Sequence, residues 1–165
     1  MKQKRYCLIR SFTLIGNLFP QFLVLCFITF FVDFDKGAYI SSIWFFGYAV
    51  NLLLKNTIRK ARPSSENAKV SVKGYSLPSG HAFMSTVFFF TVSSFFIFPV
   101  YVDYLCTLVP IFLGLSRLYL KVHDHWDIIA GWFFALAYLF LFSKTAIYIC
   151  SKVLILMDIL LTRAT

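Results

Sequence analysis

Long apolar runs alternate with short polar segments along most of this chain. The apolar runs lie at roughly residues 11–32, 38–54, 81–102, 104–120 and 126–149. Each comes close to the ~20 mainly apolar residues that a membrane-spanning helix needs. The alternation typical of barrel strands is absent, so the pattern predicts an all-α, polytopic transmembrane bundle of about five spans. The tail, 150–165, is too short for another span and is predicted to lie at the membrane interface.

The composition also indicates an integral membrane protein. Of the 165 residues, 59% are hydrophobic and 20% aromatic, while only 14% are charged; soluble domains carry about a quarter charged residues. The length suits one domain, 1–165. A net charge of +9 would suggest nucleic acid in a soluble protein. Here the cations lie between apolar runs, which favours the lipid bilayer and an anionic substrate as partners, not nucleic acid.

Polar clusters interrupt the apolar runs at three places: "KNTIRKARP" at 55–63, "LPSGH" at 77–81 and "SRLYLKVHDHWD" at 116–127. The second span ends in the first cluster, and the third span starts from the second cluster on the same face of the membrane. The fourth span returns to that face and ends in the third cluster. Counting the spans therefore predicts that all three clusters meet at one end of the bundle.

Cations in these clusters are candidates for binding an oxyanion. Arginine is suited to bidentate phosphate contacts, and lysine acts as a point charge. Because they would converge beside histidines, the oxyanion site is predicted from Lys55, Arg62 and Arg117. The alternative for each is a snorkelling anchor at the membrane surface. The remaining cations of these segments are predicted to be solvated or to face lipid headgroups: Arg59, Lys60, Lys69, Lys73 and Lys121.

The start of the third span offers further anion-binding groups. Ser79 is a candidate N-cap, and Gly80 would let a ligand approach the backbone closely. A helix start presents unpaired N–H groups and the positive end of the helix dipole. His81 would then stand in the first turn beside a bound anion. The alternative is an ordinary capping turn with an incidental histidine.

The stretch "HDHWD" places His123 four residues before Asp127. If it forms the first turn of the fifth span, the two side chains share a face. The carboxylate would then accept a hydrogen bond from Nδ1 of the imidazole and leave Nε2 free as nucleophile or base. Asp124 and His125 point elsewhere and are predicted to be bystanders or supporting groups. A metal site of His123, His125 and Asp127, with or without His81, is an alternative, although the spacing matches no usual helical metal motif.

Together the clusters resemble the type-2 phosphatidic acid phosphatase superfamily. Its signature is Lys, six residues, Arg-Pro; then Pro-Ser-Gly-His; then Ser-Arg, five residues, His, three residues, Asp. Every position is present, in order, from Lys55 to Pro63, from Pro78 to His81 and from Ser116 to Asp127. The resemblance covers roughly residues 38–150, and the first span carries no family signal.

The resemblance implies a role for each matched residue. His123 would attack phosphorus and form a phosphohistidine, Asp127 would orient it, and His81 would protonate the leaving oxygen before water hydrolyses the intermediate. The groups holding the phosphoryl oxygens would be Lys55, Arg62, Arg117, Ser79 and Gly80. No metal or cofactor is implied, since fixed cations take that role, and vanadate would inhibit.

The substrate implied is a membrane lipid phosphate or diphosphate: undecaprenyl diphosphate, phosphatidylglycerol phosphate, phosphatidate or a lipid A phosphate. Membrane members of the family commonly have six spans and a site on the extracytoplasmic face. With five spans the basic N-terminus would share the side of the site, and its charges favour the cytoplasm. We follow the family and expect a bacterial inner-membrane protein with its site facing the periplasm.

Two other functions are compatible with the sequence. The phosphoryl group could pass to a lipid acceptor instead of water, which would make the protein a transferase. A small transporter or non-catalytic membrane subunit is also possible, because ionisable residues within membranes often mark a transport pathway. The clustering of these residues at one face argues against it. The oligomeric state is left open.

Overall fold

The computed structural model describes residues 11, 13–63 and 74–142, and its regular elements there are all helices. In chain order they are α2 (Leu18–Phe27), η1 (Ile28–Val32, a π-helical segment that continues α2), α3 (Phe34–Ile58), α4 (Gly80–Phe95), α5 (Val100–Tyr119) and a last described helix, His125–Phe142. The predicted all-α bundle is confirmed, with five helical segments in this part of the chain. The predicted tail, 150–165, and the end of the fifth run lie outside the described residues.

Three of these helices are long and apolar enough to cross a membrane: α3, α5 and His125–Phe142. The continuous segment Leu18–Val32 is apolar but shorter. Large aromatic side chains cover the outside of the bundle, where Phe31 is 79% and Phe19 70% exposed. A surface of this kind is stable against hydrocarbon and unfavourable in water. The protein is therefore an integral membrane protein.

The boundaries of the first two predicted spans are wrong. The run 11–32 is interrupted by a turn at Gly16 and Asn17, and α2 begins only at Leu18. At its other end, Asp33 caps α3 by accepting a hydrogen bond from the Lys36 N–H at 3.0 Å. This cap lets α3 begin at Phe34, earlier than the predicted 38, and the helix continues to Ile58 instead of 54.

The third predicted span, 81–102, is also too long. Helix α4 ends at Phe95, and the extended Phe96 leads into a short link before α5 begins at Val100. Pro99 explains the break, because a residue that precedes proline is disfavoured in the helical conformation. Proline itself suits the start of the next helix.

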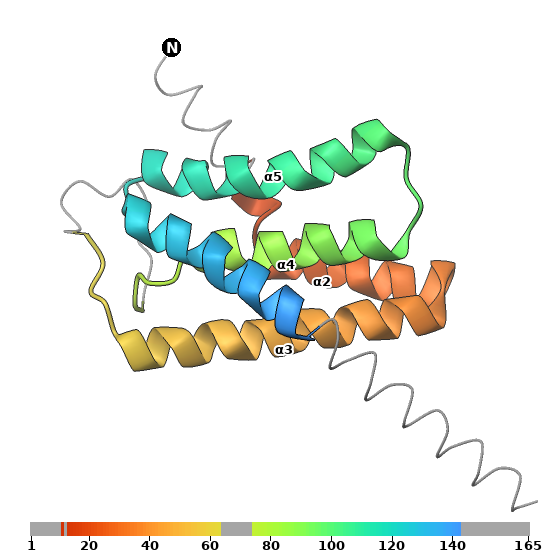
Figure 1. Cartoon of the computed structure of the whole chain (residues 1–165), viewed down its shortest axis with the longest axis horizontal. Coiled ribbons are helices and arrows are strands. Elements are labelled where there is room, and N and C mark those ends of the chain that lie inside the picture. The colour runs from red at the N-terminus through yellow and green to blue at the C-terminus, as the bar shows by residue number, and fades with distance from the viewer. Residues whose placement is uncertain (1–10, 12, 64–73, 143–165) are drawn as a thin grey trace, which may run out of the picture.

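Helix α4 is the central element and packs against both α3 and α5 (Figure 1). Buried side chains occur on nearly every side of it, from Ala82 to Phe88 and at Thr91. The last described helix crosses it closely at Gly131, where a Cβ atom would lie 2.9 Å from Cβ of Ala82. Figure 1 shows that the end of α3, the start of α4, the end of α5 and the start of the last helix all lie at one end of the bundle.

Candidate active site

Direct hydrogen bonds join the three polar clusters at that end. The backbone N–H of Ser79 donates to the carbonyl oxygen of Asp127 at 2.9 Å, which ties the start of α4 to the start of the last helix. The N–H of Ser76 donates to the carbonyl oxygen of Lys60, also at 2.9 Å. The segment after α3 is thereby held beside the start of α4. The convergence expected from counting spans is therefore present in the structure.

His123 and Asp127 form a buried pair. Nδ1 of His123 lies 3.2 Å from Oδ2 of Asp127, and the two residues are 5% and 0% exposed. Nε2 of the same imidazole lies 3.2 Å from Nη1 of Arg62. A guanidinium can only donate, so Nε2 must accept and Nδ1 must carry the proton. Burial lowers the pKa of His123, although the hydrogen bond to Asp127 acts in the opposite direction. A neutral imidazole with a lone pair on Nε2 results.

The helix that carries Asp127 begins at His125, so His123 precedes its first turn instead of lying within it. A reciprocal pair of hydrogen bonds still brings the two side chains together. Oδ1 of Asp124 accepts from the N–H of Asp127 at 3.0 Å, and Oδ2 of Asp127 accepts from the N–H of Asp124 at 3.1 Å. This is the geometry of a capping box. Asp124 is therefore the helix cap, a role that the Asp-x-x-Asp spacing could have revealed.

Lys60 was expected to be solvated or to face headgroups, and the structure corrects this. Its Nζ donates to Oδ1 of Asp127 at 2.8 Å and also to Oδ2 of Asp124. Burial lowers the pKa of Lys60, but the hydrogen bonds to both carboxylates outweigh it and the pKa is raised. No motif marks this lysine. It reaches Asp127 because Arg59 adopts a left-handed conformation (φ 53°) that ends α3 and turns the chain back over the site.

The predicted phosphate-binding cations lie around the same pair. Nζ of Lys55 donates to the carbonyl oxygen of Tyr75 at 3.1 Å, and Arg62 donates to the carbonyl oxygens of Gly74 and Val122 at 2.9 and 3.0 Å. Arg117 is only 6% exposed and lies close enough to Arg62 for the two charges to repel each other. Burying like charges together is unfavourable unless an anion joins them.

Several buried polar atoms at this end have no hydrogen-bond partner among the described residues: Nδ2 of Asn51, Oγ of Ser79 and Nε of Arg117. Buried polar groups are nearly always paired, so each of these needs an explanation. Ser79 occupies the predicted N-cap position of α4, yet its side chain makes no capping hydrogen bond. All three groups can donate, and an oxyanion would accept from them. Asn51 was not predicted from the sequence.

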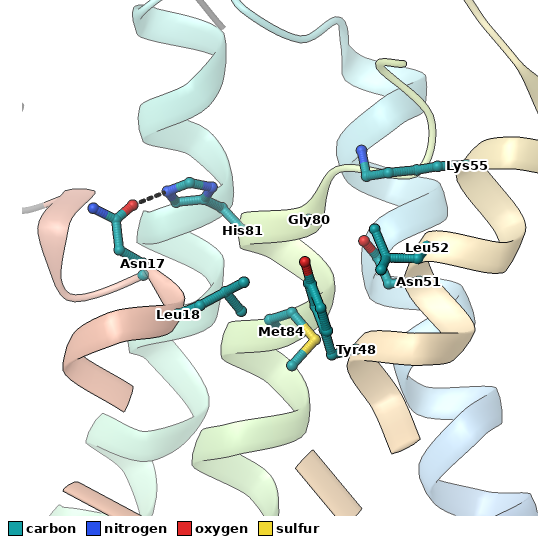
Figure 2. Close-up of a pocket in the computed structure, with 10 residues that line it drawn as sticks. Asn17, Leu18, Tyr48, Asn51, Leu52, Lys55, Gly80, His81 and Met84 are labelled. Atoms are coloured by element: carbon teal, nitrogen blue, oxygen red, sulfur yellow. Dashed lines mark hydrogen bonds between the residues drawn. The ribbon is translucent and has the colours of Figure 1, made fainter. Parts of the chain in front are cut away.

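His81 lies on the other side of Gly80 from Lys55, as Figure 2 shows. Its Nε2 is 2.9 Å from Oδ1 of Asn17, which belongs to the turn before α2. In the same turn, a Cβ atom on Gly16 would lie 3.0 Å from Cδ2 of His81. The N-terminal segment therefore contributes directly to the surroundings of His81. No sequence pattern predicts this contact, because it joins residues 64 positions apart.

A metal site is not assembled by these residues. His125, one of the alternative ligands, is exposed. Within the part of the chain that the structure describes, no group of three histidine, cysteine, aspartate or glutamate side chains is arranged to hold a metal ion.

Comparisons with known proteins agree with this fold. A family model described as "PAP2 superfamily" matches residues 36–149, a range that nearly coincides with the signature-bearing part of the chain. The structure is similar to that of a transmembrane PAP2-type phosphatidylglycerolphosphate phosphatase from Bacillus subtilis, with a TM-score of 0.73 and 21% identity. The alignment covers 86% of this chain and 76% of the other. No curated protein matches the sequence.

Replacing Lys60 by methionine should lower the free energy of unfolding by about 1–3 kcal/mol. The fully buried Asp127 would lose one of its partners, and the effect is moderated because Lys60 is one-third exposed. Thermal unfolding in detergent measures the change. Lys121→Met removes the same charge from an exposed position nearby and should change stability by less than about 0.5 kcal/mol. Equal effects of the two substitutions would contradict a structural role for the Lys60–Asp127 pair.

Proposed function

Because this chain belongs to the PAP2 superfamily and is a membrane phosphatase that acts on lipid phosphates, we propose that His123 is its nucleophile. The observation that carries the proposal is the state of the His123 imidazole. Its Nδ1–H is held by Asp127, while its Nε2 lone pair accepts from Arg62 and becomes available for attack when Arg62 turns to a bound phosphoryl group. Nucleophilic catalysis needs this arrangement of a nucleophile and an orienting group.

The first step forms a phosphohistidine. His81 takes up a proton when the anionic substrate binds. The lone pair on Nε2 of His123 then attacks phosphorus, the bond from phosphorus to the leaving oxygen breaks, and His81 donates its added proton to that oxygen. Asp127 stabilises the positive charge that develops on the imidazole. The phosphoryl oxygens are held by Lys55, Arg62, Arg117, the Ser79 hydroxyl and the Gly80 N–H. Burial of Arg117 and the unpartnered atoms of Ser79 and Arg117 support this assignment.

The second step releases phosphate. His81 takes a proton from a water molecule, the water oxygen attacks phosphorus, and the phosphorus–nitrogen bond to His123 breaks. The sum is hydrolysis of one phosphate ester or anhydride to an alcohol or a shorter phosphate and inorganic phosphate. Positive charge comes from fixed side chains throughout, so the proposed reaction needs no metal ion. Phosphoryl transfer of this kind depends mainly on positioning and charge stabilisation.

The substrate is a lipid phosphate or diphosphate at the membrane surface. The site lies at one end of a bundle whose sides are apolar, so a headgroup can reach it while the hydrocarbon remains in the bilayer (Figure 1). The candidates are phosphatidylglycerol phosphate, the substrate named for the Bacillus subtilis protein, together with phosphatidate, undecaprenyl diphosphate and lipid A phosphates.

Replacing His123 by alanine should reduce phosphate release from these lipids by at least about 10³-fold, because the nucleophile is lost. The measurement is release of inorganic phosphate from each lipid by purified protein in the presence of EDTA. His125→Ala is the matched control, since it removes an exposed imidazole two positions away, and it should remain close to wild type. Undiminished release by the His123→Ala variant would exclude the proposed nucleophile.

The pH dependence of kcat/KM should show an acid limb below the ordinary imidazole value of about 6.5. His123 attacks only when neutral, so activity falls as the pH falls through its pKa, and burial together with the charge of Arg62 lowers that pKa. In the Arg62→Gln variant the limb should move to higher pH. Ionisation of the substrate is the same for both proteins and cancels in the comparison. An unchanged or lower limb in the variant would contradict the assignment.

We place the site on the periplasmic face of a bacterial inner membrane, as the family resemblance suggests. The last described helix, His125–Phe142, starts at the site, runs away from it (Figure 1) and is long and apolar enough to cross a membrane. A reporter fused after Phe142 should therefore report a cytoplasmic location. A periplasmic signal from that fusion would place the site in the cytoplasm.

A further inference from the structure

A cavity of about 320 Å³ opens beside His81 and Lys55, between the turn before α2, helix α3 and the start of α4 (Figure 2). Its lining is divided by polarity. One end carries the side chains of Asn51, Lys55 and His81, and the remaining wall is largely apolar, with Leu18, Leu52 and Met84. A ligand that fits it has a polar group next to the catalytic end and hydrocarbon beyond it.

Asn51 is the least expected residue in this lining. It is only 2% exposed, and its Nδ2 has no hydrogen-bond partner among the described residues. It lies one turn before Lys55 on the same face of α3. Its Oδ1 lies 3.5 Å from the position that a Cβ atom on Gly80 would occupy, so the amide sits next to the predicted phosphate site. Leaving such a donor unpaired costs stability in the free protein.

The proposed role of His81 decides which part of a substrate this cavity receives. A general acid must lie within hydrogen-bond reach of the oxygen that it protonates. The leaving oxygen therefore lies beside His81, and the rest of the leaving group continues into the space that His81 lines. The cavity is on the path of the lipid that departs, and it meets the proposed phosphate site at Lys55 and Gly80, which line both.

We propose that this cavity is the leaving-group pocket and that Asn51 is a substrate-binding residue, whose Nδ2–H donates to an oxygen of the leaving group near the scissile bond. The inference rests on the function proposed above. It assigns a substrate class: lipids in which the leaving group carries a hydrogen-bond acceptor close to the scissile bond, followed by hydrocarbon. A glycerolipid ester and the second phosphate of a prenyl diphosphate both supply that acceptor.

The test uses Asn51→Leu and Asn51→Ala with three substrates: dioctanoyl phosphatidate, farnesyl diphosphate and dodecyl phosphate, the last of which has no acceptor beyond the scissile oxygen. We expect kcat/KM to fall about 10- to 100-fold for at least one acceptor-bearing lipid, and much less for dodecyl phosphate. The lipid that responds identifies the source of the acceptor. Asn56→Leu makes the same change at an exposed position of α3 and should have no such effect.

Stability separates this role from a structural one. Leucine is close to asparagine in size and removes an unpaired buried amide, so Asn51→Leu should melt at or above the wild-type temperature while it loses lipid turnover. An equal loss with all three substrates, no loss with any, or a lower melting temperature that accounts for the lost activity would overturn the proposal. If His123→Ala loses turnover while both Asn51 variants keep full activity, the role of Asn51 is rejected and the proposed function stands.

Discussion

The arrangement of this site depends on one buried carboxylate. Asp127 is fully buried, and an ionised carboxylate in such a place is stable only when its oxygens are paired. It accepts from the Lys60 ammonium, the His123 ring and the Asp124 N–H, with the Ser76 hydroxyl 3.5 Å away. These donors come from the segment after α3, the approach to α4 and the link after α5. The hydrogen bonds to Asp127 therefore hold three parts of the chain together.

The hydrogen-bond donors at this end of the bundle are not all paired. Both oxygens of the Asp127 carboxylate accept hydrogen bonds, whereas three nearby donors lack a partner within the described part of the chain: Ser79 Oγ, Arg117 Nε and Asn51 Nδ2. Donors that are fixed in place before the substrate arrives need no reorganisation during the reaction. In the proposed function, the paired carboxylate holds the site in place and the unpaired donors bind the oxygens of the phosphoryl group.

The sequence predicted the parts that depend on local pattern. Apolar run length located all five helical segments, and signature spacing identified residues that the structure places together, such as Arg62 and His123. It misjudged helix ends at Asp33 and Pro99, where caps and proline override hydropathy. Lys60 and Asn17 were missed for another reason. Their contacts, to Asp127 and His81, depend on turns at Arg59 and Gly16 whose consequences appear only in three dimensions.

The turn before α2 lies outside the residues that match the family, yet Gly16, Asn17 and Leu18 form part of the cavity wall beside His81. One part of the proposed leaving-group pocket is thus encoded outside the stretch that matches the family, while the rest of its wall and the proposed phosphate-binding residues lie within that stretch. If the pocket has the proposed role, substitutions at Gly16, Asn17 or Leu18 would change the preferred lipid and leave the proposed catalytic residues intact. Such a division gives evolution a way to diversify substrates around a constant reaction centre.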